Sequence, residues 1–207
     1  MATLVIETAT TACSVALIED GRVLAAAHEV VSRGHAERLV PMIAELPGGG
    51  RAATILVDCG PGSFTGVRVG LAAAIGLGIG WGVPVSGYSS LALLAATRFA
   101  AQPALTRIAA VMEGGHGEVF VQAFSARPFA SVAPLSSLTP EAALVALAGL
   151  ETVGNGVGRL LALDPAMSAE DILPDASQAV LLPLEFRQLP SKPIYGRAPD
   201  AKPQAAG

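Results

Sequence analysis

Residues 58–78, DCGPGSFTGVRVGLAAAIGLG, follow an apolar strand pattern at residues 53–57 and contain six glycines. Gly60, Gly62 and Gly66 stand between that strand and a helix expected over residues 65–80. Backbone amides at such a helix start can hold an anion. However, the stretch has no GK[ST], does not fit GxGxxG, and gives Ser63 no flanking glycines of a nucleophile elbow. The pattern favours a tight turn into a closely packed helix over a phosphate loop, and both interpretations stay open.

The helix itself carries a strip of very small residues. Gly66, Gly70 and Ala74 recur every fourth position and therefore share one face, with Val69 and Ala73 beside them. A face of this kind admits another helix at short distance, either from the same domain or from a partner. A second amphipathic helix, near residues 35–46, also needs cover on its Leu39 and Met42 side, which favours a partner.

The order of elements outward from this stretch indicates an α/β fold. Apolar strand patterns at residues 3–7, 12–18 and 22–31 precede the first helix, and a strand at residues 83–89 separates the last two helices. Three hairpin-linked strands followed by crossovers predict a mixed sheet flanked by helices, as in the ribonuclease H-like fold of actin, sugar kinases and Hsp70. We expect a first lobe at residues 1–101, a smaller lobe at 102–190 and an extended tail at 191–207.

Composition limits the possible functions. The chain is 52% hydrophobic and only 14% charged, so either a partner covers part of its apolar surface or an alanine-rich composition accounts for the excess. A net charge of −4 argues against binding nucleic acid alone. The sequence around Cys13 and Cys59 is apolar, which indicates buried thiols in a reducing compartment. No secretion leader is evident, so we expect a cytoplasmic protein. The apolar run at residues 69–85 is short for a membrane span.

No catalytic or metal centre can be located in the sequence. The three histidines form no i, i+4 pair, and no HExxH or Cys/His cluster exists. A metal-free peptidase would need a nucleophile–base pair that nothing locates, and the residue 113–118 turn, EGGHGE, is either a small polar site or a solvated hairpin tip. Glu7 ends the first strand, but the following TATT contains no glycine to admit phosphates, which argues against tight ATP binding. An actin-like ATP-binding hydrolase or kinase remains the alternative function.

Six blocks in order carry a family resemblance: ETATTACSVAL, GHAERLVPMIAEL, GPGSFTGVRVGLAAA, VPVSGYSSL, GEVFVQAF and TVGNG. Together they resemble the bacterial TsaB (YeaZ) family over nearly the whole chain. The most specific block is GPGSFTGVRVGL at residues 60–71. One departure is Glu7, because the family usually has Asp at that position.

The resemblance implies two ribonuclease H-like lobes and a non-catalytic partner of TsaD, the enzyme that transfers a threonylcarbamoyl group to the tRNA adenosine next to the anticodon. It further implies TsaE as a third subunit, tRNA contact only through the complex, a homodimer when alone, and no membrane association. No cofactor is expected on the subunit alone, and ATP only in the assembled complex. The implied interface uses the helices at residues 35–46 and 65–78, with these residues: His35, Leu39, Met42, Gly66, Val69, Gly70, Ala73 and Ala74.

Overall fold

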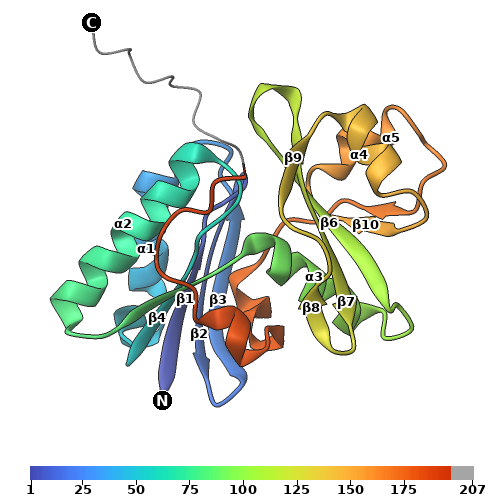
Figure 1. Cartoon of the computed structure of the whole chain (residues 1–207). Coiled ribbons are helices and arrows are strands. Elements are labelled where there is room, and N and C mark those ends of the chain that lie inside the picture. The colour runs from blue at the N-terminus through green and yellow to red at the C-terminus, as the bar shows by residue number, and fades with distance from the viewer. Residues whose placement is uncertain (197–207) are drawn as a thin grey trace, which may run out of the picture.

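The computed structural model describes residues 1–196, which form two α/β lobes side by side (Figure 1). The first lobe is built on a five-stranded sheet of order β3-β2-β1-β4-β5. Strands β1 (Ala2–Glu7), β2 (Ala12–Glu19) and β3 (Arg22–Val30) form an antiparallel meander, and β4 (Thr54–Asp58) and β5 (Val85–Tyr88) continue it in parallel. The mixed sheet expected from the sequence is confirmed.

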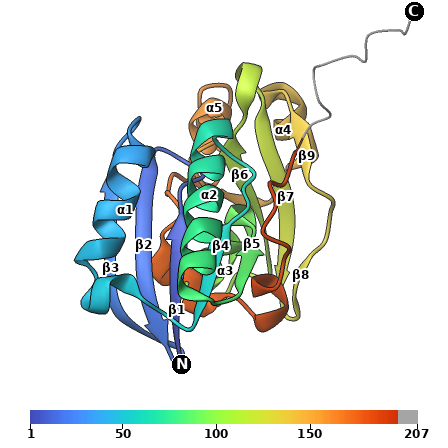
Figure 2. The ribbon, with the colours of Figure 1, turned by 90° about the vertical axis from the view of Figure 1, so that its left-hand side faces the viewer.

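Helices cover both faces of this sheet. Helices α1 (His35–Glu45) and α2 (Phe64–Trp81) lie together on one face (Figure 2), and α3 (Ser90–Ala101) lies on the other, between the two sheets (Figure 1). Helix α1 runs through Pro41, whose ring faces solvent. Among the described residues α2 alone has the length and apolar composition of a membrane span, but a third of it is buried on its own sheet. Core helices of soluble proteins can have the same length and apolar composition.

The second lobe has a six-stranded sheet of order β11-β10-β6-β7-β8, with β9 paired to β7. Its long hairpin joins β6 (Arg107–Glu113) to β7 (Val119–Ala126) through a short 3₁₀ turn, and helix α4 begins at Pro140 behind a Thr139 cap. The remaining elements are β8 (Phe129–Ser131), β9 (Ser136–Leu138), α4 (Pro140–Ala146), β10 (Glu151–Val153), α5 (Val157–Leu161) and β11 (Ala169–Glu170).

The expected boundary of the second lobe at residue 190 is wrong. After β11 the chain returns to the first lobe, where the 3₁₀ helices η3 (Ala176–Leu181) and η4 (Leu184–Arg187) pack against β2, α3 and β5. The Ser14 hydroxyl lies 3.3 Å from the Asp175 carboxylate and accepts a hydrogen bond from the Ala176 amide. Burial of Ala176, Ala179 and Leu182 draws this segment back, and so short a segment shows no periodicity in the sequence.

The chain then runs along the open edge of the first sheet. Residues 189–196, called the strap here, pair Leu189 with Gly87 of β5 through two backbone hydrogen bonds of 2.7 and 3.0 Å. The Ile194 amide donates to the Cys59 carbonyl oxygen at 2.7 Å, and the backbone at Gly196 reaches the ring of Phe120 in the second lobe. The rest of the predicted tail, residues 197–207, lies outside the described residues.

The two lobes are also joined by a partly buried ion cluster. Arg98 of α3 pairs with Glu151 of β10 and Glu170 of β11, and the Arg98 side chain is only 12% exposed. Because ions this deeply placed need partners to offset lost hydration, the cluster fixes α3 against the second sheet.

Candidate docking face and interlobe cleft

The small-residue strip of α2 faces the protein's own first sheet. Gly66, Gly70 and Ala74 are buried, and a Cβ atom built on Gly66 would stand 2.1 Å from the Thr8 carbonyl oxygen. On Gly70 it would stand 2.3 Å from the Thr8 hydroxyl. Of the two alternatives that the sequence left open for the neighbour of this strip, the same domain is therefore the one observed, and the strip is covered within the chain itself. The glycines let α2 approach the carboxyl end of β1 more closely than a residue with a side chain would allow.

Thr8 is the residue that holds the start of α2 in place. Its hydroxyl lies 2.9 Å from the Gly66 carbonyl oxygen and 3.1 Å from Asp58 Oδ1, and its amide donates to the same carboxylate oxygen at 2.8 Å. Ser63 caps the helix by accepting the Gly66 amide hydrogen at 3.2 Å. The turn after β4 is thus a tight, internally bonded junction, which is the interpretation that the sequence favoured.

The predicted interface residues on α1 are also turned inward. Leu39 and Met42 are fully buried, and His35 is 8% exposed with Nε2 3.1 Å from the Ala12 carbonyl oxygen. On α2, Val69 and Ala73 are half-buried at the edge of the helix. Six of the eight predicted residues therefore belong to the core of the first lobe. Their direct contact with a partner stays a prediction, and the surface open to a partner is formed by other residues.

That surface is a second stripe of α2, offset from the glycine strip. Its members lie at i, i+4, i+8, i+11 and i+15, so they follow one line along the helix. Phe64 is 70% exposed, Ile75 42% and Ile79 79%. We call this set the outer stripe: Phe64, Arg68, Ala72, Ile75 and Ile79. On neighbouring α1, Val40 is 54% exposed with Ala36 and Ala44 one turn to either side. Sequence reasoning missed these positions because it followed the small residues rather than the large apolar ones opposite them.

A pair of carboxyl groups is buried beneath α2. Glu7 and Asp58 end β1 and β4, and both are fully buried. Burial, reinforced by Asp58, raises the pKa of Glu7 well above its usual range, and burial raises the pKa of Asp58 to about 7. Glu7 is surrounded by the Ala9 amide and by the Tyr88 and Ser90 hydroxyls at 2.9–3.0 Å, whereas Asp58 Oδ2 has no hydrogen-bond partner. The Glu7 carboxyl group is thus held inside the first lobe by three hydrogen-bond donors of the chain itself.

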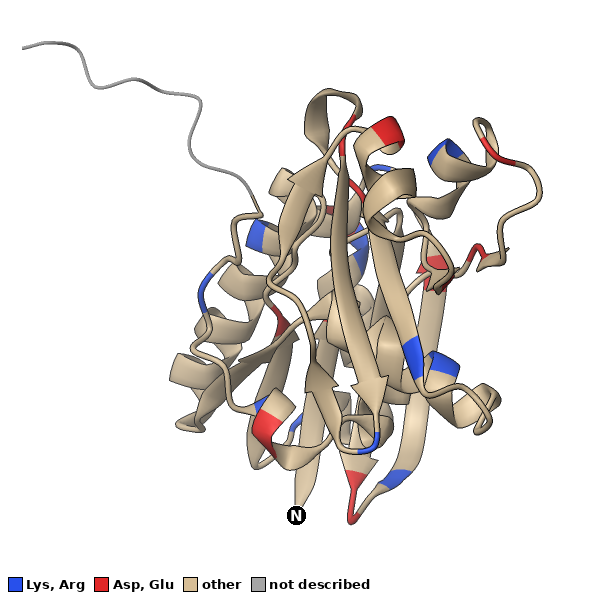
Figure 3. Cartoon of the chain, turned by 45° about the vertical axis from the view of Figure 1, so that its right-hand side comes forward, with Lys and Arg blue, Asp and Glu red and all other residues tan. Residues whose placement is uncertain are grey.

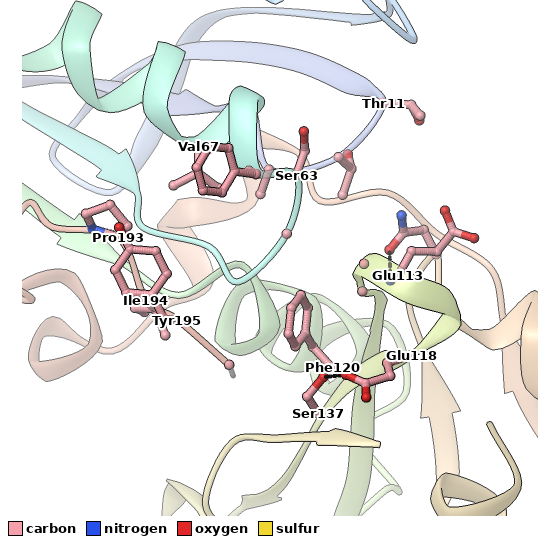
Figure 4. A pocket seen from close by; sticks show the side chains of 18 of the residues that line it. Thr11, Ser63, Val67, Glu113, Glu118, Phe120, Ser137, Pro193, Ile194 and Tyr195 are labelled. Atoms are coloured by element: carbon pink, nitrogen blue, oxygen red, sulfur yellow. Dashed lines mark hydrogen bonds between the residues drawn. The ribbon is translucent and has the colours of Figure 1, made fainter. Parts of the chain in front are cut away.

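A cleft of about 790 Å³ opens between the lobes. One wall comes from the β1–β2 turn and the start of α2, and the opposite wall from the β6–β7 hairpin; the strap lies along the side. Figure 4 shows Ser63 and Val67, Pro193 to Tyr195, and Glu113, Glu118 and Phe120 around this common opening. Glu118 accepts a hydrogen bond from the Ser137 hydroxyl at 2.6 Å, and Glu113 pairs with Arg159 at 3.3 Å.

The turn after β1 and the start of α2 are hydrogen-bonded to each other and to the buried carboxyl groups. Three amides at the turn after β1 have acceptors inside the chain: Thr8 donates to Asp58, Ala9 to Glu7 and Ala12 to the Thr10 hydroxyl. The Ser63 amide at the start of α2 donates to the Ala9 carbonyl oxygen at 2.7 Å, which closes the space between the two loops. Across the cleft the hairpin presents carboxylates, which repel phosphate. The two loops therefore hold each other.

A Ser/His/Asp group is present within residues 1–196, but its order is not that of a serine hydrolase. Asp175 stands between Ser14, at 3.3 Å, and His28, at 3.5 Å. In a serine hydrolase the histidine must contact the serine, and Ser14 is fully buried. Within residues 1–196 no group of three or more His, Cys, Asp or Glu side chains could hold a metal ion.

Charges are sparse on the molecule. In the view of Figure 3, Lys and Arg residues stand singly among tan ribbon and form no continuous basic stripe. Over residues 1–196 this distribution differs from the clustered basic patch that is typical of nucleic-acid-binding domains.

Comparison with known proteins points to one family. The sequence model of TsaD, described as tRNA N6-adenosine threonylcarbamoyltransferase, matches residues 27–127. The chain is 41% identical over 127 residues to the Escherichia coli (strain K12) tRNA threonylcarbamoyladenosine biosynthesis protein TsaB, covering 58% of this chain and 53% of the relative. The Haemophilus influenzae protein of the same name is 39% identical over 113 residues, with 52% and 48% covered. These matches span about half the length of the curated relatives.

Two solved structures cover the chain almost completely. The crystal structure of an uncharacterized protein with similarity to peptidase YEAZ from Pseudomonas aeruginosa is 30% identical with a TM-score of 0.80, covering 95% of this chain and 99% of that one. The structure of YeaZ from Pseudomonas aeruginosa is 29% identical with a TM-score of 0.79, covering 94% and 99%. The similarity therefore includes both lobes and the strap side of the molecule.

Proposed function

The chain belongs to the TsaB (YeaZ) family, and from that premise we propose that it is a non-catalytic scaffold subunit of the tRNA threonylcarbamoyladenosine modification machinery. It binds a TsaD-type threonylcarbamoyltransferase through the outward face of α1 and α2 and activates it. The tRNA adenosine next to the anticodon is the substrate of the complex, and the subunit reaches tRNA only within that complex. The place of action is the cytoplasm.

The observation that carries the proposal is the apolar outer stripe of α2. This 18-residue helix has one charged residue, Arg68, and leaves Ile75 and Ile79 largely open to solvent. Large apolar side chains that gather on one exposed face mark a protein–protein contact. Fully burying one such side chain contributes about 1.5–3 kcal/mol, so two isoleucines and Val40 can dominate an interface.

The same face supports the remaining partner assignments. A lone subunit with this face uncovered forms a homodimer through it, and the TsaD-type subunit displaces the second copy. TsaE joins the heterodimer as an ATPase, and any nucleotide belongs to the assembled complex. The internally bonded loops of the cleft favour this assignment over an actin-like ATP-binding hydrolase or kinase.

Co-expression of the tagged full chain with the TsaD-type subunit of the same genome tests the proposal. We expect recovery of both subunits in a one-to-one ratio, and faster threonylcarbamoyl transfer to tRNA when the chain is added to that enzyme. Recovery of the chain alone, together with a transfer rate that is the same with and without the chain, contradicts the scaffold role. Magnesium-ATP binding to the isolated chain with Kd below about 10 μM, roughly 7 kcal/mol, would favour the kinase alternative.

A further inference from the structure

An ordered aromatic–arginine cluster stands at the mouth of the cleft. The Arg68 guanidinium carbon lies 3.4 Å from the centre of the Phe64 ring and 5.6 Å from that of Tyr195. Its two terminal nitrogens donate to the Phe64 carbonyl oxygen at 2.8 Å and to the Tyr195 hydroxyl at 2.9 Å. These contacts fix a long side chain that is mobile on most surfaces. The Arg68 guanidinium is therefore pre-oriented, and its Nε hydrogen still points to no partner within residues 1–196.

Within residues 1–196, Arg68 also has no carboxylate partner. The ion pairs of the described part of the chain involve Arg38, Arg98, Arg159, His28 and the amino terminus, and Arg68 is in none of them. A guanidinium that is held flat, keeps free donors and has no carboxylate of its own is suited to bind a carboxylate in two-point geometry.

The cluster is continuous with the docking face. Phe64 and Arg68 are the first two members of the outer stripe, and the stripe runs on to Ile75 and Ile79 along the same line of α2. Phe64 and Tyr195 are 70% and 64% exposed. Arginine and tyrosine in such positions are the residue types that supply most of the binding energy of protein interfaces.

We propose that the Phe64–Arg68–Tyr195 cluster anchors a carboxylate-bearing segment of the TsaD-type subunit, at the end of the interface opposite Ile79. This inference rests on the proposed function and adds a charged anchor and a strap residue to it. A single protein carboxylate fits better than RNA, because Arg68 is the one Lys or Arg among the described residues that line the cleft, whereas a phosphate backbone is held by several cations.

Calorimetric titration of the full chain with the TsaD-type subunit, at low and high salt, tests the anchor. Arg68→Gln is expected to weaken binding at least tenfold and to reduce its salt dependence, Arg68→Lys to restore only part of the affinity, and Tyr195→Phe to weaken it about threefold. The matched control is Arg127→Gln, an exposed arginine of the second lobe that donates to the Pro103 carbonyl oxygen. It is expected to bind like the wild type.

The outcomes separate this inference from the proposed function. If Arg68→Gln keeps its thermal midpoint and binds within twofold of the wild type while Ile79→Glu does not bind, the anchor is wrong and the scaffold stands. If the wild type itself does not bind, both fail. If Arg68→Gln leaves subunit affinity unchanged but lowers crosslinking of tRNA to the complex, the cluster is an RNA contact, which also overturns the proposal.

Discussion

Replacing Gly70 by alanine tests how α2 is seated. The new Cβ would stand 2.3 Å from the Thr8 hydroxyl and 3.3 Å from Asp58 Oδ1, so Thr8 must move. Overpacking of this kind costs about 1–3 kcal/mol, and loss of the Thr8 hydrogen bond adds about 1 kcal/mol. The better helix propensity of alanine offsets about 1 kcal/mol of this loss in the free energy of unfolding. We therefore expect a net destabilisation of about 2 kcal/mol. The same contact makes larger residues such as leucine at position 70 a test of folding, not of docking.

Gly76 supplies the matched control, because it lies in the same helix with no atom within 4 Å of an added Cβ. Gly76→Ala should stabilise the chain by up to about 1 kcal/mol. Chemical denaturation of the two variants should then differ by about 3 kcal/mol, and Gly70→Ala in a Thr8→Ala background should lose most of its penalty. Equal stability of the two alanine variants, or an unchanged penalty without the Thr8 hydroxyl, would refute the reasoning.

Two further predictions concern buried charge. Burial raises the folded-state pKa of Asp58 to about 7, above its value in the unfolded chain. The protonated carboxyl therefore contributes to the free energy of unfolding in full below about pH 4, and this contribution is lost as pH rises through 7. Asp58→Asn should flatten that decline in thermal melts from pH 4 to 8, and an unchanged profile would exclude Asp58 as its source. Arg98→Met leaves Glu151 buried without its partner and should cost about 3 kcal/mol in urea denaturation, whereas the exposed pair of Arg38 should tolerate the same change. If the Arg98 and Arg38 variants lose the same free energy of unfolding, the ion cluster of Arg98 does not fix the two lobes against each other.

Helices and strands could be predicted from the sequence wherever the local hydrophobic pattern alone determines the element. Strand alternation and the spacing of Leu39 and Met42 located β1, β2, β3 and α1, because each of these elements depends on local periodicity. The return of residues 176–187 to the first lobe could not be foreseen. It depends on a few buried alanines and leucines whose partners are distant in the chain.

For the docking surface, too, the local sequence indicated some features, whereas others depend on contacts between residues that are distant in the chain. The sequence indicated which helix matters, but the spacing of Gly66, Gly70 and Ala74 only states that something comes close. Whether that neighbour is a partner or the Thr8 backbone depends on the register of α2 against β1, which no local pattern encodes. The Arg68–Tyr195 contact joins residues 127 positions apart and was likewise invisible.

The central claim is that the outer stripe of α2 binds the TsaD-type subunit. Its most direct test is calorimetric titration of that subunit with Ile79→Glu, compared with Val145→Glu, a change at an equally exposed position of α4 in the second lobe. The account predicts that Ile79→Glu folds normally but binds at least a hundredfold more weakly, about 2.7 kcal/mol, and that Val145→Glu binds like the wild type. Undiminished binding by Ile79→Glu would contradict it.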